Sequence, residues 1–375
     1  MRLMLVGVLC PSAFGLNPAL DINQYAHKAS TVGEGFFKGS IYAIAQTPDG
    51  YLWMGTESGL ARFDGVRSLE WQPPNGEHLP GGRIRSLLAA RDGRLWIGTD
   101  LGLASWKDGR LTQYAELSGK AVLSILEDHE ATIWAGTWGV GSTDGRLCTI
   151  RDGRVRCHVD DGRLGNGIDG LYEDQGGKLW AGNPDGVWRW KPEPAKFFPV
   201  AIVTSSFAEG DGGELLITTL DGIKTLVNEQ AGPYLVRAAG RQSKFGRLLR
   251  DRDGGLWVGT YDGGLLHVHH GKTDRFTHSD GLSSDKILYL FEDREGSICV
   301  LSGDGREGHY GLPGMRERAK LVGGKLTIWT ELDSGTEIEL VIPGARAYVK
   351  STRLFWYFGS APRHKGDKKE TIEHE

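Results

Sequence analysis

The chain has 375 residues, of which 39% are hydrophobic and 25% are charged, the proportions of a soluble globular protein. A net charge of −4 without a basic patch argues against nucleic acid as a partner. The 56 glycines lie in turn dipeptides rather than in tracts, which predicts many short strands joined by tight turns.

The first fifteen residues have the parts of a secretory signal peptide. Arg2 supplies a positive charge, residues 3–10 an apolar core, and residues 13–15 a cleavage site of small-x-small type. The alternative is a buried N-terminal strand. No other stretch approaches twenty apolar residues, so no further transmembrane segment is expected. We therefore expect a mature chain that begins near Leu16 and is periplasmic or secreted.

A phrase of the type GxLWxGT recurs about every forty residues, the spacing of propeller repeats. Each copy holds four short alternating segments separated by Asp-Gly or Gly turns, which is typical of antiparallel hairpins. First strands are expected at residues 40–47, 83–90, 121–128, 167–174 and 286–293. The copies are centred on Trp53, Trp96, Trp134, Trp180, Leu216, Trp257 and Cys299.

Seven such units predict an all-β, seven-bladed β-propeller over residues 16–302, because a ring of sheets buries each face against the next. The glycine after the Trp is expected where inner strands crowd near the axis and a side chain would obstruct the neighbouring blade. The seventh blade keeps only its first two strands before the repeat breaks. A strand around residues 25–32 is expected to close the ring as the outermost strand.

Three copies of the phrase carry a family resemblance. The segments DGYLWMGTESGLARFDG (49–65), DGRLWIGTDLGLASWKDG (92–109) and DGGLWVGTYDGGLLHV (253–268) resemble the repeats of two-component regulator propellers. The resemblance covers roughly residues 20 to 300. It implies the extracytoplasmic sensor region of a bacterial sensor histidine kinase or hybrid two-component protein.

The repeat stops after Val300, and residues 303–345 predict a small α+β fragment. Pro313 suits a helix first turn, and Met315, Ala319 and Val322 share one helical face. The segments KLTIWTEL (325–332) and TEIELVIP (336–343) then predict a hairpin. The spacing GxGxxG at residues 303–308 also matches a dinucleotide fingerprint, but Pro313 places the helix start well after those glycines.

Residues 308–343 are similar to the C-terminal end of the ATP-binding domain of histidine kinases. The resemblance matches Gly311 and Leu312 to the loop at the nucleotide phosphates and Thr336 to a late Gly-Thr position. The family's asparagine box and phosphorylatable His have no counterpart. The resemblance therefore implies a truncated, catalytically inactive kinase remnant with no cofactor, since ATP and Mg would need the complete domain. The alternative is a functional sensor histidine kinase or ATPase taking part in a phosphorelay.

The tail at residues 346–375 is expected to be disordered. Its aromatic cluster LFWYF (354–358) is an alternative membrane-surface anchor, although five residues without a helical moment do not establish one.

Cys148 and Cys157 flank a predicted two-residue Asp-Gly turn. With that turn, the two cysteines face each other in a non-hydrogen-bonded pair, where Cα atoms approach closely enough for a disulfide. A three-residue turn would shift the register and remove the pairing. Outside the cytoplasm such a pair should oxidise. Cys299 is expected to be a buried substitute for the repeat's Trp.

Candidate ligand-binding residues follow the Gly-Thr of each repeat, at turns that recur on one face of a propeller. They suit a small molecule or a glycan, and the alternative is ordinary solvated turn residues. A membrane sensor kinase is a candidate partner. The candidates are Glu57, Asp100, Trp138, Asn183, Leu220 and Tyr261.

No catalytic or metal site is predicted. His267, His269 and His270 suggest metal ligation, but we expect an outer-strand face in water instead. No Ser-His-Asp or paired-carboxylate arrangement is evident, and the Asp residues before Gly are explained by turns. A propeller lyase or hydrolase would need clustered acids or His at the channel mouth.

Overall fold

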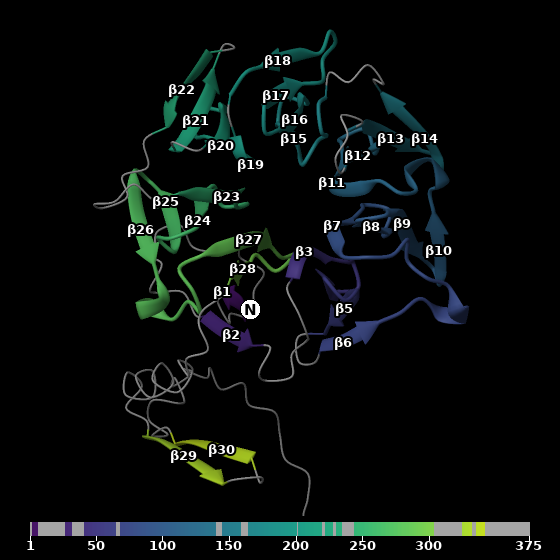
Figure 1. The fold of residues 1–375 in the computed structure, drawn as a ribbon. Coiled ribbons are helices and arrows are strands. Elements are labelled where there is room, and N and C mark those ends of the chain that lie inside the picture. Colours follow the sequence, from purple (N-terminus) through teal and green to yellow (C-terminus); the bar gives the residue numbers. More distant parts are fainter. Residues whose placement is uncertain are drawn as a thin grey trace, which may run out of the picture. The chain divides into compact units, whose positions relative to one another are not determined.

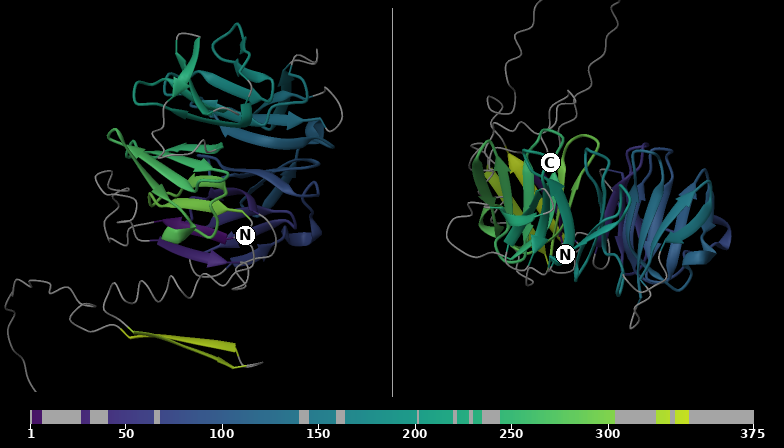
Figure 2. Two further views of the ribbon diagram at one scale, coloured as in Figure 1. Left: turned by 60° about the vertical axis from the view of Figure 1, so that its left-hand side comes forward. Right: turned by 90° about the horizontal axis from the view of Figure 1, so that it is seen from above.

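The structure is a computed structural model that describes residues 2–6, 27–31, 41–64, 68–139, 145–158, 164–200, 202–219, 222–227, 230–234, 244–303, 325–331 and 335–341. Chain contacts divide it into two units, Met1–Gly308 and His309–Glu375. The first unit is an all-β propeller that ends near the predicted boundary at residue 302. Figure 1 shows the blades of this unit around a common axis, and Figure 2 shows them from two further sides.

Six blades are antiparallel sheets of four consecutive strands, as the repeat predicts, with the first strand innermost. The first three blades are β3 (Ile41–Gln46), β4 (Leu52–Thr56), β5 (Leu60–Phe63) and β6 (Ser68–Trp71); β7 (Ile84–Ala89), β8 (Leu95–Thr99), β9 (Gly102–Lys107) and β10 (Arg110–Gln113); and β11 (Ala121–Glu127), β12 (Ile133–Trp138), β13 (Leu147–Arg151) and β14 (Arg154–His158).

The next three blades repeat the same order. They are β15 (Gly170–Glu173), β16 (Leu179–Asn183), β17 (Gly186–Arg189) and β18 (Lys196–Phe198); β19 (Ile202–Glu209), β20 (Leu215–Thr219), β21 (Gly222–Val227) and β22 (Gln230–Tyr234); and β23 (Phe245–Arg250), β24 (Leu256–Thr260), β25 (Leu265–His269) and β26 (Lys272–Phe276). Within the described ranges the helical elements are short 3-10 turns at Pro74–Gly76, Ala115–Leu117 and His278–Asp280.

A further sheet, which we call the closing sheet, combines strands from both ends of the propeller. Its order is β2 (His27–Thr31), β1 (Arg2–Val6), β28 (Ile298–Ser302) and β27 (Ile287–Glu292). β2 takes the outermost position expected for a strand near residues 25–32. β1 supplies the missing third strand from residues that the sequence assigns to a signal peptide, so the structure does not show that peptide. An open edge of β28 explains the pairing, because its backbone groups need partners.

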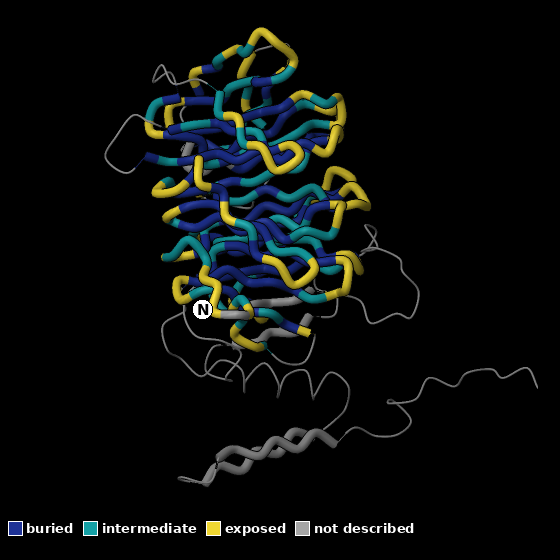
Figure 3. The backbone as a smooth tube through the Cα atoms, turned by 90° about the vertical axis from the view of Figure 1, so that its right-hand side faces the viewer, coloured by how far each residue is buried: buried dark blue, intermediate teal, exposed yellow. Residues whose placement is uncertain are grey.

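Apolar clusters fill the spaces between neighbouring sheets, and Figure 3 shows this burial inside the stack with exposed turns at its margins. Trp53 and Leu60 of the first blade pack with Ile84 and Ile97 of the second. Cys299, buried at the position of the repeat's Trp, packs against the first blade. Because this cluster and the one between β24 and β27 both include the closing sheet, the sheets meet around the axis.

The glycine after the repeat's Trp lies where two blades come closest. A Cβ on Gly55 would lie 2.5 Å from Ile84 Cγ2 in the next inner strand. A Cβ on Gly259 would lie 2.6 Å from Ile287 Cγ2. Both distances are too short for carbon atoms, so these positions need glycine, as the sequence analysis expects.

An aspartate six residues before the Trp organises the first turn of several blades. In the sixth blade Asp251 accepts hydrogen bonds from the Trp257 indole Nε1 at 2.7 Å and from the Gly255 backbone N–H at 2.6 Å. The same indole bond joins Trp134 to Asp128 at 2.8 Å and Trp180 to Asp174 at 2.9 Å. These aspartates therefore tie the turn to the buried ring of the second strand.

The second unit contains one described hairpin. β29 (Lys325–Glu331) pairs antiparallel with β30 (Gly335–Val341), at the residues that the sequence predicts as two strands. The predicted helix after Pro313 lies outside the described residues. The resemblance to a kinase domain therefore rests on sequence alone.

Candidate functional site

The last residue of each inner strand stands at one mouth of the central channel. Most of these residues carry a charge, and the Glu-Asp pairs at the ends of β11, β15 and β27 are visible in the sequence. The seven residues are Gln46, Ala89, Glu127, Glu173, Glu209, Arg250 and Glu292.

These residues join each blade to the one before it through contacts that we call inter-blade clasps. In a clasp, the residue that ends an inner strand accepts a hydrogen bond from a backbone N–H in the first turn of the preceding blade. The donor and acceptor pairs are Arg91 with Glu127 at 2.7 Å, His129 with Glu173 at 2.7 Å, Gln175 with Glu209 at 3.3 Å, Arg252 with Glu292 at 3.1 Å, and Arg294 with Gln46 at 2.6 Å.

The two remaining junctions lack this hydrogen bond, and in each of them both the turn residue and the strand-end residue differ from those of the clasps. Between the first and second blades the turn residue is Pro48, which has no N–H, and the strand ends at Ala89, which has no acceptor. Between the fifth and sixth blades the charges are exchanged, and Arg250 donates to Asp211. The turn residue and the strand-end residue thus differ together, so neither junction leaves a donor or an acceptor of the clasp without its partner.

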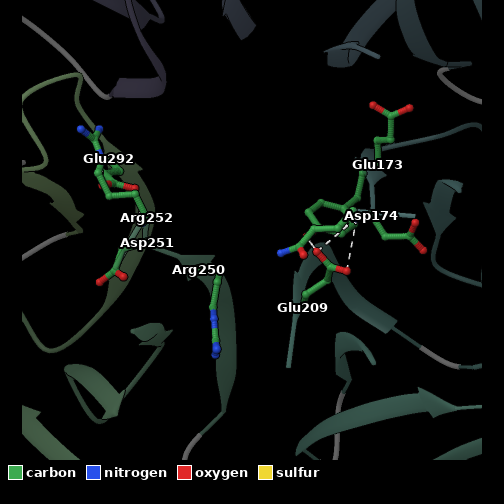
Figure 4. A pocket seen from close by; sticks show the side chains of 9 residues that line it. Glu173, Asp174, Glu209, Arg250, Asp251, Arg252 and Glu292 are labelled. Carbon is green, nitrogen blue, oxygen red and sulfur yellow. Dashed lines mark hydrogen bonds and ion pairs between the residues drawn. The ribbon is translucent and has the colours of Figure 1, made fainter. Parts of the chain in front are cut away.

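Part of this mouth is a cavity of about 440 Å³, lined by residues of the fourth, fifth and sixth blades and the closing sheet. Figure 4 shows Glu173, Asp174 and Glu209 on one side of it and Arg250, Asp251, Arg252 and Glu292 on the other. The lining is completed by Tyr172 and Gln175. The cavity therefore brings together side chains of both charges, most of which also take part in the clasps or in the Asp–Trp hydrogen bonds.

The electrostatics of the cavity follow from burial. Burial raises the pKa of the Tyr172 hydroxyl far above its usual range, and the nearby Glu209 and Asp174 carboxylates raise it further. Tyr172 donates a long hydrogen bond of 3.5 Å to Glu209. Burial also raises the pKa of Glu292, against the opposing effect of Arg252. Tyr172 therefore stays a neutral hydroxyl donor at physiological pH.

The residues predicted from the sequence lie at the other end of each second strand. The cavity adjoins the turn before each second strand. The predicted residues instead come at the end of the second strand, next to its Gly-Thr or the equivalent pair. Glu57 is exposed and Trp138 is half-buried. Leu220 lies outside the described residues.

Three of the predicted residues have structural partners. Asp100 forms ion pairs with Arg85 at 2.5 Å and with Arg83 at 3.2 Å. Asn183 is buried, and its side chain accepts hydrogen bonds from the backbone N–H groups of the following turn, as in an Asx turn. The Tyr261 ring lies over Gly246, whose missing Cβ would be 3.1 Å from it. Their polar contacts do not join these residues into one site.

The predicted nucleotide-binding residues are only partly described. Gly311 and Leu312 lie outside the described residues. Thr336 lies in β30, opposite Thr330 of β29.

The expectation of a solvated histidine face is wrong. His267 and His269 are buried on β25, and His267 stacks on Trp257 with ring centroids 4.1 Å apart. The His269 ring stacks on His267 in turn, at 4.5 Å and 19° between planes. The period of two places both residues on the strand face of Leu265, and that face packs against the closing sheet, where Leu265 and Trp257 contact Ile287.

His267, His269 and Asp274 lie close enough to one another to raise the question of a metal ion. A metal bound to imidazole lies in the ring plane, along the nitrogen lone pair. The two rings are nearly parallel and stacked, so one ion cannot lie in both planes. His269 Nε2 is moreover within 2.8 Å of Asp274 Oδ2. The cluster is a packed core arrangement.

The structure joins Cys148 and Cys157 by a disulfide across the hairpin of β13 and β14. The pairing register runs from Arg151 opposite Arg154 to Cys148 opposite Cys157, which is that of a two-residue turn. The bridge lies at the outer edge of the third blade, away from the channel.

Comparison with protein families finds the two component regulator propeller at three places, residues 35–58, 78–100 and 241–262. No curated protein matches the chain. Within the described residues, no helix is long and apolar enough to cross a membrane.

Solved structures share the fold. The extracellular domain of a hybrid two component system from B. thetaiotaomicron is 18% identical with a TM-score of 0.55, over 71% of this chain and 40% of that one. This chain therefore spans well under half of that domain. An inactive virginiamycin B lyase from Staphylococcus aureus, with quinupristin, is 14% identical with a TM-score of 0.55, over 70% and 95% of the two chains. YCF48 bound to a D1 peptide is 14% identical with a TM-score of 0.52, over 71% and 92%.

Proposed function

We propose that this chain is the ligand-sensing propeller of an extracytoplasmic two-component sensor, and that it binds a small polar molecule or a glycan. The observation that carries the proposal is the mouth cavity, where side chains of both charges from neighbouring inner strands converge. The three matches to the regulator propeller family support the sensing role. The solved relatives add support for the fold only, since propellers serve many functions.

Three further points belong to this proposal. The closing sheet acts as a seventh blade and seals the ring by pairing the two ends of the propeller. The chain works outside the cytoplasm, where the facing cysteines Cys148 and Cys157 would be oxidised. The C-terminal segment is a kinase remnant without catalytic activity, because the asparagine box and phosphoacceptor His of the family are missing from the sequence.

Binding at the mouth is tested by thermal unfolding of the full chain with a panel of amino acids, monosaccharides and oligosaccharides. A ligand at a hundred times its dissociation constant stabilises the folded state by about 2.7 kcal/mol. The variants Glu209→Gln and Arg250→Gln should remove this shift, and the exposed Glu70→Gln serves as the control. A shift that persists in both cavity variants would place the ligand elsewhere and contradict the mouth site.

The alternative of an active kinase is tested separately, by calorimetric titration of the full chain with ATP and magnesium. We expect no saturable heat, because the sequence has no counterpart of the asparagine box. Micromolar affinity would overturn the assignment of an inactive remnant while leaving the propeller site untouched.

A further inference from the structure

The junction between the fourth and fifth blades differs from the other glutamate clasps. Three of the four clasp glutamates accept a backbone N–H from the preceding turn and also pair with the basic side chain of that turn residue. These ion pairs are Arg91 with Glu127 at 3.2 Å, His129 with Glu173 at 2.6 Å, and Arg252 with Glu292 at 2.5 Å. The turn residue that meets Glu209 is Gln175, which carries no charge.

Glu209 is consequently a buried acid with no cationic partner among the described residues. It is 7% exposed. Its carboxylate accepts only long hydrogen bonds, at 3.3 Å from the Gln175 backbone N–H to each oxygen and at 3.5 Å from the Tyr172 hydroxyl. Buried charges are normally paired, because removing an uncompensated charge from water is costly. Glu209 therefore lacks the partner that the other clasp glutamates have.

The charge around Glu209 favours a cation. The mouth cavity is lined by five carboxylate side chains and only two guanidinium groups. One guanidinium is held by the clasp of Glu292, and the other, Arg250, donates to the exposed Asp211. The first turn of the fifth blade, EGDGGE (209–214), contains three acids and no base. The cavity therefore has an excess of negative charge, which attracts small cations.

The position of Glu209 makes it accessible to a ligand in the cavity. Glu209 and Tyr172 both line the cavity. In Figure 4 the carboxylates of Glu173 and Asp174 point away from the Arg250 side of the cavity, whereas Glu209 lies nearest to that side. Glu209 is therefore the acid of its group that a ligand between the two sides would meet first.

The geometry suits an organic cation better than a metal ion. Within the part of the chain that the structure describes, no three acid or His side chains of this cavity lie close enough together to hold a metal. An ammonium group needs less, because one carboxylate and one aromatic side chain can hold it. The Tyr172 ring, which stacks on Phe207 with centroids 6.3 Å apart, lies beside Glu209. Its hydroxyl oxygen can accept from an ammonium while it donates to Glu209.

We propose that the ligand of the mouth cavity carries an ammonium group, which takes the place that the basic turn residue has in the other glutamate clasps. Glu209 accepts hydrogen bonds from this ammonium, and Tyr172 contacts it. An amino sugar or a short aliphatic amine has the required chemistry and fits a cavity of about 440 Å³. This inference rests on the proposed function, because it names the chemical class of the ligand that the propeller senses.

The test is calorimetric titration of the full chain with two amines and with neutral molecules of similar shape, at constant ionic strength. The pairs are glucosamine with glucose, and 1,4-diaminobutane with 1,4-butanediol. We expect at least one amine to bind saturably with millimolar affinity, because few contacts hold so small a ligand. Its neutral counterpart should bind at least about tenfold more weakly. In a separate series, a higher salt concentration should weaken binding of the amine.

Two variants assign the ammonium to Glu209. Glu209→Gln keeps the size of the side chain but removes its charge, so affinity for the amine should fall at least about tenfold. Gln175→Arg supplies from the chain itself the cation found in the other clasps, and amine binding should disappear. Because Gln175 is exposed, this variant should fold even if Glu209→Gln does not. The matched controls at exposed positions of outermost strands, which should bind like the wild type, are Glu70→Gln and Gln230→Arg.

Three outcomes would overturn the proposal. Neither amine binds to the wild type. A neutral molecule binds as tightly as its amine. Glu209→Gln or Gln175→Arg binds the amine as well as the wild type does.

These outcomes differ from failure of the sensing proposal. If neither amine binds, a neutral sugar that stabilises the wild type but not Arg250→Gln would still keep the mouth cavity as the sensing site, and only the ammonium would be excluded. A wider panel in which no compound acts through the cavity would contradict the sensing proposal itself.

Discussion

The sixth and second blades contain the same strand order and the same Trp-centred phrase, yet their first turns are built differently. In the sixth blade Asp251 accepts from Trp257 and from two backbone N–H groups of its turn. In the second blade Ala90 accepts with its carbonyl alone, and Asp92 takes the Arg94 N–H instead. The comparison teaches that the fold tolerates loss of the aspartate, although the buried Trp96 Nε1 is then left without a hydrogen-bond partner.

The largest expected effect comes from making the sixth blade resemble the second. Asp251→Ala leaves the buried Trp257 N–H and two turn N–H groups without their acceptor, so unfolding should become easier by about 3–4 kcal/mol. Denaturant unfolding of the variant measures this, with the exposed Asp253→Ala as control. A loss below about 1 kcal/mol would mean that the sixth blade tolerates alanine as well as the second does, and the comparison would fail.

The next effect concerns the histidine stacked on Trp257, which has no counterpart in the second blade, where Ser105 pairs opposite Trp96. Burial and, after it, the neighbouring His269 together lower the pKa of His267 to about 4, against the opposite effect of Asp274. Because the folded pKa lies below the unfolded value of about 6.5, the folded state favours the neutral ring. This contribution to stability is complete above that unfolded value and is lost as pH falls toward 4.

The predicted loss is up to about 3 kcal/mol of unfolding free energy between those pH values. His267→Phe should lack this part of the acid sensitivity, whereas the exposed His78→Phe should retain it. Denaturant midpoints measured across the window give the result. Equal slopes in the wild type and His267→Phe would show that other groups dominate acid unfolding.

The smallest effect belongs to the clasps, where the two blades are alike. Glu292 accepts from Arg252 of the sixth blade, and Glu127 accepts from Arg91 of the second. Both pairs are partly solvated, so Glu292→Ala and Glu127→Ala should each cost about 1 kcal/mol. Comparable losses in thermal unfolding would confine the difference between the blades to their first turns. A large inequality would show that the defect at Ala90 spreads to the neighbouring junction.

Much of the fold follows from the period of the Trp-centred phrase. The inner strand expected at residues 121–128 is β11, Ala121–Glu127, because its alternation lies between a Ser-Gly turn at 118–119 and the turn that follows Asp128. The ends of the ring are less predictable. Residues 3–6 are an apolar run that suits both a signal peptide core and a strand, and only the open edge of β28 distinguishes the two.

The position of the site was harder to predict, because polar residues stand at both ends of several second strands. Asp100 and Asn183 attract attention in the sequence, but their side chains are occupied by Arg85 and by a local turn. The mouth cavity depends on how strand-end side chains from several blades meet, which no single repeat encodes. The burial of His267 likewise depends on its neighbour Trp257, which period-two alternation alone does not reveal.

The clasp between Arg294 and Gln46 joins residues 248 positions apart in the chain. During synthesis at about 5–20 residues per second, the first blade must wait on the order of 10–50 seconds before its last neighbour leaves the ribosome. Until then the apolar surface around Ile41, Leu52 and Phe63, which Cys299 and Leu301 cover in the finished ring, faces solvent. The nascent first blade therefore keeps this apolar surface open to wrong contacts until the strand of Cys299 and Leu301 arrives.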